Sequence, residues 1–158
     1  AVARLLDLRP AIIRGNASEI IALAGGRSAG KGVDAGNAVA QAEQSASAIA
    51  QARRSVVAVT GEVDFVTDGI RSARIAGGSA LMPRVTATGC ALSATVGAFA
   101  AMSPGDPYAA AVAALSCFAL AGARAGAVAE GPGSFAWRFL DALASLEADS
   151  LTRESPLR

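Results

Sequence analysis

Apolar positions fall into short continuous runs and into longer segments with a helical period. Residues 11–13 form a short apolar run, and residues 55–60 form a longer one, as is typical of strands buried on both faces. Residues 62–67 and 71–75 flank Asp68 and Gly69, a pair that favours a tight turn, and predict a hairpin. Strands that alternate with helices predict an α/β fold with a mainly parallel sheet.

Helices are predicted at residues 1–9, 18–24, 37–53, 90–102 and 108–129, with a last helix after residues 131–134. Ser134 is expected to be the N-cap of that last helix. Residues 25–36 are rich in glycine and predict a loop, and residues 150–158 are polar and expected to fray. The positions expected to face the core are Val39, Ala42, Ala46, Ile49, Phe135, Phe139, Leu140, Leu143 and Leu146.

Composition narrows the class of protein. The chain has 158 residues, a length typical of one domain, and is 53% apolar but only 4% aromatic. Its longest apolar stretch, residues 108–128, is mostly alanine and includes Ser116 and Arg124, so we interpret it as a core helix and expect no membrane span. A net charge of +1, without a basic cluster, gives no support for a nucleic-acid partner.

Histidine is absent, which excludes histidine-based triads and histidine-bound zinc. A metal would need carboxylate ligands, which favours Mg²⁺. Cys90 and Cys117 form no CxxC pair, which is typical of reduced thiols in the cytoplasm. The chain begins at Ala1, without methionine or a signal-peptide pattern, and residues 1–9 resemble the interior of a helix. We therefore expect it to be the later part of a longer protein.

Two predicted strand ends carry polar side chains, and open α/β sheets bind ligands at the carboxyl ends of their strands. Arg14 ends the first strand, where it could reach a phosphate, and Glu19 could hold Mg²⁺ or its water molecules. Asn16 and Glu19 also have the spacing of a capping box, which needs no ligand. At the next strand end the Thr60 hydroxyl could bond a phosphate or nucleotide, and two nearby carboxylates, Glu62 and Asp64, also fit a solvated hairpin face.

The most informative stretch is the turn of small residues at 86–90, which precedes an apolar helix. A helix start of this kind presents backbone N–H groups and the positive end of the helix dipole to an anion. Cys90 would lie at that end, where a thiol can shift toward thiolate. The alternative is a packed helix whose first turn holds a small cysteine. A Walker P-loop is absent, because Lys31 precedes glycine, and we expect Lys31 to be solvated.

Several motifs together resemble the hydroxyethylthiazole kinase family of the ribokinase-like superfamily. They are RGNASEIIALAG (14–25), GKGVDA (30–35), VVAVTGEVDFVTDG (56–69), LMPRVTATGCALSA (81–94) and GPGSFAWRFLDAL (131–143). The resemblance implies a three-layer α/β sandwich and transfer of the ATP γ-phosphate to the primary hydroxyl of 4-methyl-5-(2-hydroxyethyl)thiazole, in thiamine salvage. It also implies a homotrimer.

By this resemblance Arg14 contacts the ATP phosphates, Thr60 contacts the nucleotide, and Glu19 lies near Mg²⁺. Gly89 belongs to the anion hole, and Cys90 stands where most ribokinase-like enzymes carry a catalytic aspartate, so that both lie at the accepting hydroxyl. Phosphoryl transfer depends chiefly on positioning and charge neutralisation. Cys90→Ser is therefore expected to keep substantial activity, whereas Gly89→Val is expected to abolish phosphate binding.

The chain departs from the family in two respects. Ala87 replaces a usual glycine, and alanine reaches a positive φ only at a cost, so we expect a slightly altered turn. The N-terminal portion of the family has no counterpart here, so residues 1–158 are expected to be the C-terminal portion of one kinase domain. Two alternatives stay open: another ribokinase-like small-molecule kinase or ATP-dependent hydratase, and a nucleotide-binding subunit without catalysis.

Overall fold

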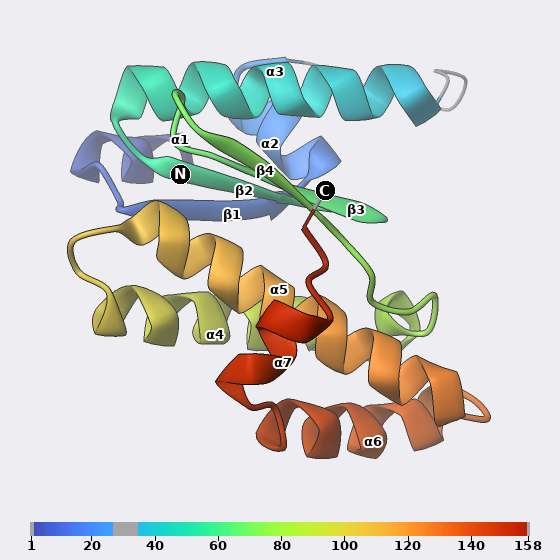
Figure 1. Ribbon diagram of the computed structural model, residues 1–158. Coiled ribbons are helices and arrows are strands. Elements are labelled where there is room, and N and C mark those ends of the chain that lie inside the picture. The colour runs from blue at the N-terminus through green and yellow to red at the C-terminus, as the bar shows by residue number, and fades with distance from the viewer. Residues whose placement is uncertain (1, 27–34, 158) are drawn as a thin grey trace. The chain divides into compact units, whose positions relative to one another are not determined.

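The computed structural model describes residues 2–26 and 35–157 of the chain (Figure 1). It divides into two compact units, residues 1–74 and 75–158, and each is described by itself. Lys31 and most of the predicted glycine-rich loop lie outside the described residues.

The first unit is a sheet with helices packed on it. After the short helix α1 (Val2–Leu5) and a 3-10 helix (Leu6–Leu8), the chain forms β1 (Ile12–Asn16), α2 (Ala17–Leu23) and α3 (Ala35–Arg53). The strands β2 (Val56–Thr60), β3 (Val63–Thr67) and β4 (Ser72–Ala76) follow. The order in the four-stranded sheet is β1-β2-β3-β4. β1 pairs with β2 in parallel and β2 with β3 antiparallel, so the sheet is mixed.

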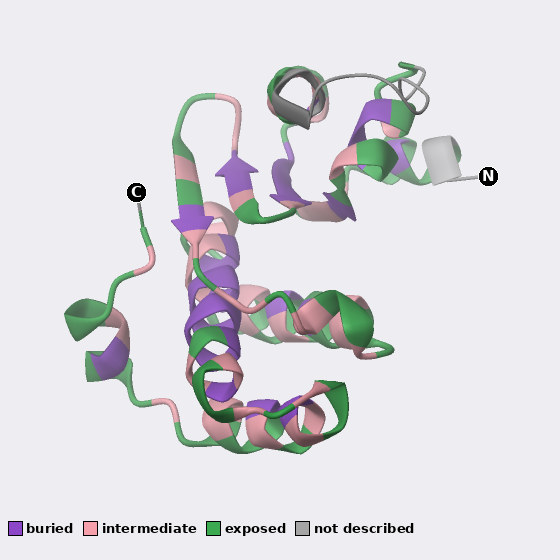
Figure 2. Ribbon diagram, turned by 90° about the vertical axis from the view of Figure 1, so that its right-hand side faces the viewer, coloured by how far each residue is buried: buried purple, intermediate pink, exposed green. Residues whose placement is uncertain are grey.

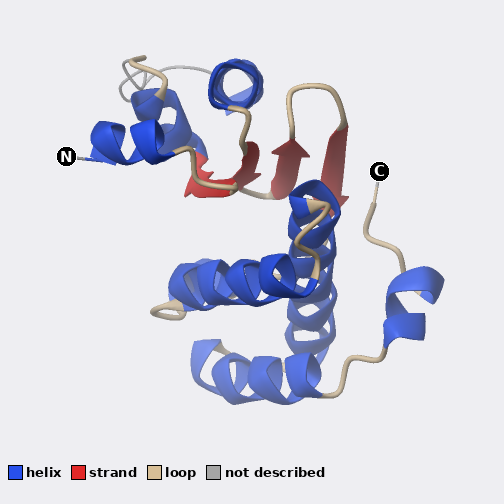
Figure 3. Ribbon diagram, turned by 90° about the vertical axis from the view of Figure 1, so that its left-hand side faces the viewer, coloured by secondary structure: helices blue, strands red, loops and turns tan. Residues whose placement is uncertain are grey.

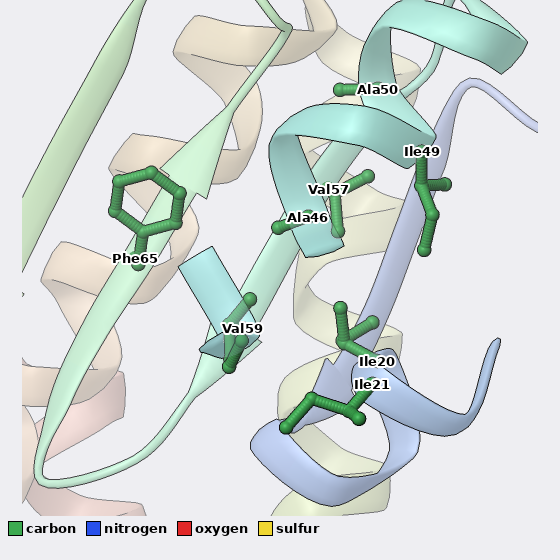
Figure 4. Packing of buried hydrophobic residues seen from close by; sticks show 9 residues of the cluster. Ile20, Ile21, Ala46, Ile49, Ala50, Val57, Val59 and Phe65 are labelled. Carbon is green, nitrogen blue, oxygen red and sulfur yellow. The ribbon is translucent and has the colours of Figure 1, made fainter. Parts of the chain in front are cut away.

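Burial of β2 explains why its sequence is continuously apolar. Val56, Val57, Ala58 and Val59 are all buried, with α3 packed against the strand. Figure 4 shows Ile20 and Ile21 of α2 and Ala46, Ile49 and Ala50 of α3 beside Val57, Val59 and Phe65. Val39, which was expected on this face of α3, is 54% exposed, so that prediction was wrong.

The predicted hairpin is present, and one aspartate closes its turn. Asp68 Oδ1 accepts from the backbone N–H groups of Ile70 and Arg71 at 2.9 and 2.6 Å. The Thr67 hydroxyl donates to the Arg71 carbonyl and accepts from Gly69 N–H. Gly69 has φ +90° and packs against Gln51 of α3, so its missing side chain serves both the turn and this contact.

The second unit is mostly helical. It contains a 3-10 helix (Met82–Arg84), α4 (Thr88–Met102), α5 (Pro107–Val128), α6 (Pro132–Ala144) and α7 (Ala148–Arg153). Both α4 and α6 contact α5, which is the most buried of these helices (Figures 2 and 3). Phe118 of α5 meets Phe139 of α6 edge to face at 4.8 Å between ring centroids, and Phe135 is fully buried beside them.

Three sequence predictions for the C-terminal part are corrected. Gly131, and not Ser134, is the N-cap of α6, and Ser134 Oγ accepts from Gly131 N–H from within the first turn. Leu140 is 63% exposed, because only Phe135 and Phe139 of the expected stripe are fully turned toward α5. Where a frayed tail was expected, residues 148–153 form α7, and Leu157 pairs with Ile75 in an antiparallel bridge.

The helix α5, with 22 residues, is long and apolar enough to cross a membrane by length and composition. More than half of its most apolar window, 56%, is buried inside the protein. Core helices of soluble proteins have the same properties, so α5 is weak evidence for a membrane span.

Candidate functional site

Four side chains gather where β1 and β2 end, and we call Arg14, Glu19, Thr60 and Asp64 the sheet-end cluster. The parallel register pairs Arg14 with Ala58 and Asn16 with Thr60, which brings the two carboxyl ends to one edge. Arg14 Nη2 donates to Thr60 Oγ1 at 2.7 Å across 46 positions of sequence. The structure therefore brings together Arg14 and Thr60, the two residues predicted to contact the nucleotide.

Glu19 takes part in the capping box that its spacing predicts. Its Oε2 accepts from Asn16 N–H at 2.7 Å, and the Asn16 side chain accepts from Glu19 N–H at 3.0 Å. Gly15 lies underneath, and a Cβ there would come within 3.1 Å of Glu19 Oε2. The capping role is thus present in the structure, and the exposed carboxylate holds the start of α2 beside Arg14.

Asp64 is the member of the cluster that sequence reasoning undervalued. Instead of a solvated hairpin face, its carboxylate is partly buried, and its Oδ1 accepts from Gly61 N–H at 2.9 Å. Burial raises the pKa of the Asp64 carboxyl to about 6, against the lowering effects of the Gly61 hydrogen bond and the nearby Arg14 charge. The available signal was a carboxylate at the second position of a strand that follows a tight turn.

Gly89 and Cys90 lie in the second unit, within the first turn of α4. The N-cap of this helix is Ala87, which has φ 69° and ψ 4°. The turn therefore keeps a left-handed residue although alanine stands where glycine was expected. The Thr88 hydroxyl donates to the Val85 carbonyl at 2.8 Å, and Ala91 N–H donates to Ala87 O, which begins the helix. The Cys90 side chain is exposed.

Gly122 and Gly126 of α5 lie against the loop that leads to residues 86–90. Gly78 N–H donates to the Ala119 carbonyl at 2.9 Å, which seats the loop on the helix. A Cβ at Gly122 would lie 2.8 Å from Met82 Sδ and 3.0 Å from Gly78 Cα, and one at Gly126 would lie 2.5 Å from Ser79 Oγ. Neither glycine has room for a side chain, so close packing fixes the path into residues 86–90.

The side chains of the described residues do not form a closed cage for a metal ion. Among residues 2–26 and 35–157, the structure holds no group of three or more cysteine, aspartate or glutamate side chains that could enclose a metal ion. Mg²⁺ often keeps several water molecules and takes only one or two carboxylates together with substrate phosphates. The exposed Glu19 carboxylate fits that second arrangement and does not fit a cage made by protein ligands.

An open α/β sheet with an arginine, a hydroxyl and carboxylates at its strand ends is arranged as the ligand-binding edge of an α/β protein. Comparison with known proteins identifies the family. The model of the hydroxyethylthiazole kinase family matches residues 1–149. The chain belongs to the hydroxyethylthiazole kinase family.

Individual proteins that are similar to this chain carry the same family name. The chain is 66% identical over 151 residues to a hydroxyethylthiazole kinase of Rhizobium johnstonii, covering 96% of this chain and 57% of the relative. It is 62% identical over 153 residues to one of Gemmatimonas aurantiaca, covering 96% and 54%. The solved hydroxyethylthiazole kinase structure from Pyrococcus horikoshii matches with a TM-score of 0.84 and 30% identity, covering 99% of this chain and 57% of that one. The chain thus spans little more than half the length of these relatives.

Proposed function

We propose that this chain carries the nucleotide-binding part of a kinase that phosphorylates 4-methyl-5-(2-hydroxyethyl)thiazole on its primary hydroxyl, with ATP as donor. The observation that carries the proposal is the Arg14–Thr60 hydrogen bond of 2.7 Å at the carboxyl ends of adjacent parallel strands. An arginine held there by a hydroxyl is oriented before the ligand arrives. Arginine is well suited to phosphate oxygens because its guanidinium presents several donors in a fixed plane.

Under this proposal each predicted site residue has one task. Arg14 and Thr60 bind the nucleotide, and Glu19 lies near Mg²⁺ that is carried by the phosphates and water. Gly89 lets the transferred phosphate approach the start of α4, whose dipole favours the developing charge. Cys90 faces the accepting hydroxyl, and Mg²⁺, when bound, neutralises phosphate charge. A homotrimer and a cytoplasmic location belong to the same proposal.

The proposal is tested by substrate-dependent release of ADP from the whole protein, together with ATP binding. Arg14→Gln is expected to raise the Kd for ATP about tenfold, because a charge-assisted contact to phosphate is lost. Arg53→Gln is the matched control, since that guanidinium pairs with Asp7 instead. Cys90→Ser is expected to keep turnover within about fivefold, and Gly89→Val to abolish phosphate binding.

Each result has a definite reading. Wild-type turnover in Gly89→Val would contradict the proposal that Gly89 belongs to the anion hole. An unchanged ATP affinity in Arg14→Gln would contradict the proposal that Arg14 binds the nucleotide. ATP binding that raises the melting temperature without turnover would favour the non-catalytic alternative. ADP release with another small alcohol, and none with the thiazole alcohol, would favour another ribokinase-like kinase.

A further inference from the structure

The corner between β2 and β3 consists of Gly61 and Glu62, and packing does not hold it. Both residues are exposed, and a Cβ built at Gly61 would meet nothing closer than the Val63 carbonyl at 3.6 Å. The hydrogen bond from Gly61 N–H to Asp64 Oδ1, at 2.9 Å, does span this corner. A side chain therefore fixes the backbone at the point where β2 leaves the sheet.

Thr60, the last residue of β2, links this corner to the proposed nucleotide site. Its hydroxyl accepts from Arg14 Nη2 at 2.7 Å and lies 3.4 Å from the Gly15 carbonyl. Thr60 and Gly61 share a peptide group, so a displacement of the corner would shift the Thr60 Cα and with it the hydroxyl. The position of the Arg14 guanidinium depends in turn on that hydroxyl.

The chemistry of Asp64 is unusual for a purely structural cap. An exposed carboxylate caps a turn at little cost, whereas a partly buried one must give up water. The nearby Arg14 charge offsets part of that cost. Asp64 thus contacts the corner directly and influences the guanidinium through its charge.

On the basis of the proposed function, we propose that Asp64 is a positioning residue for nucleotide binding, because its carboxylate holds the Thr60–Gly61 corner and so keeps the Thr60 hydroxyl in place for Arg14. Asp64 makes no contact with ATP in this account. Its effect falls on ATP and leaves binding of the acceptor alcohol unchanged.

The test measures ATP dissociation constants by calorimetry and the KM for the alcohol with the whole protein. Asp64→Ala is expected to raise the Kd for ATP about tenfold, the scale of a lost hydrogen bond to a charged acceptor, with the KM for the alcohol within about twofold of wild type. Asp64→Asn keeps an oxygen acceptor and is expected to stay within about threefold of wild type for ATP. Glu62→Ala is the control on the same corner and is expected to change neither value.

Two results would overturn the proposal: an ATP affinity in Asp64→Ala equal to that of wild type, or an equal loss in Asp64→Asn and Asp64→Ala. Amide exchange at Gly61, followed by NMR, tests the corner without ATP. We expect protection in wild type and Asp64→Asn, and its loss in Asp64→Ala. If wild type binds no ATP, the proposed function fails, while unchanged Gly61 exchange in Asp64→Ala would refute the role of Asp64 separately.

Discussion

The sheet-end cluster of the first unit and the turn at residues 86–90 of the second are built in different ways. The cluster depends on side chains, such as Arg14 and Thr60, that meet across the sheet. The turn depends on its backbone path, fixed by the left-handed Ala87 and by a loop seated on Gly122 and Gly126. Loss of one polar group should therefore damage the cluster, whereas added volume should damage the turn.

The largest expected effect comes from added volume beside the turn. Gly122→Ala places a Cβ 3.0 Å from Gly78 Cα and 2.8 Å from Met82 Sδ, so the loop must move. We expect the free energy of unfolding to fall by about 3 kcal/mol, the upper end for overpacking, in urea denaturation.

Gly97→Ala is the matched control, because a Cβ there meets no atom within 4 Å. It is expected to raise the free energy of unfolding by about 0.5–1 kcal/mol through helix propensity. If Gly122→Ala were as stable as Gly97→Ala, the loop would not depend on the small size of Gly122.

A smaller effect of opposite sign is expected in the sheet-end cluster. The folded protein raises the pKa of Asp64 from 3.8 to about 6, so it holds this proton more tightly than the unfolded chain does. The free energy of unfolding therefore decreases as the pH rises from about 4 to about 6, and the loss persists above that range. At about 1.4 kcal/mol per pKa unit this shift corresponds to about 3 kcal/mol, and the partial exposure of Asp64 reduces the expected effect. Asp64→Asn should therefore be more stable than wild type by about 2 kcal/mol at pH 7.

Denaturation of both proteins between pH 4 and pH 7 measures this difference. We expect it to shrink as the pH falls toward 4 and to vanish only below about pH 3, where Asp64 is protonated in both states. A difference that does not depend on pH would show that burial of the charge is not its cause. Together with the ATP measurements, this would separate what Asp64 costs in stability from what it contributes to binding.

The smallest expected effect concerns the backbone of the turn itself. Ala87 has φ 69°, a conformation that costs a residue with a Cβ about 1 kcal/mol. Ala87→Gly is expected to raise the free energy of unfolding by up to about 1 kcal/mol in urea denaturation. Ala94→Gly, at an exposed position inside α4, should lower it by about 1 kcal/mol, and equal losses in the two variants would contradict a strained Ala87.

Local chemistry explains what the sequence predicted well. The continuous apolar run of β2, the Asp68–Gly69 turn and the Asn16–Glu19 spacing each depend on neighbours in the chain, and all three are found in the structure. The predictions that Val39 and Leu140 face the core were wrong. Helical spacing gives the direction of an apolar face but not how far the element packed against it extends.

The charge of Arg14 near Asp64 could not be predicted from local sequence, since it depends on the pairing of β1 with β2, two strands far apart in the chain. Ser134 shows the limit of local rules. Its hydroxyl does satisfy N–H groups at the start of α6, but from inside the first turn, because Pro132 occupies an early helical position and Gly131 takes the cap. The prediction that Ser134 takes part in capping α6 was therefore correct, but the N-cap itself is Gly131.

The pairing of Leu157 with Ile75 has a consequence for behaviour at high concentration. The unpaired backbone groups of an exposed strand edge can form hydrogen bonds with a strand of another chain. Ala76 N–H would be one such donor. Here that donor is taken by the Pro156 carbonyl at 2.9 Å. Proline has no N–H of its own to offer outward, so the covering segment extends the pairing poorly. Removal of residues 155–157 is therefore a route to aggregation without any change in the helices.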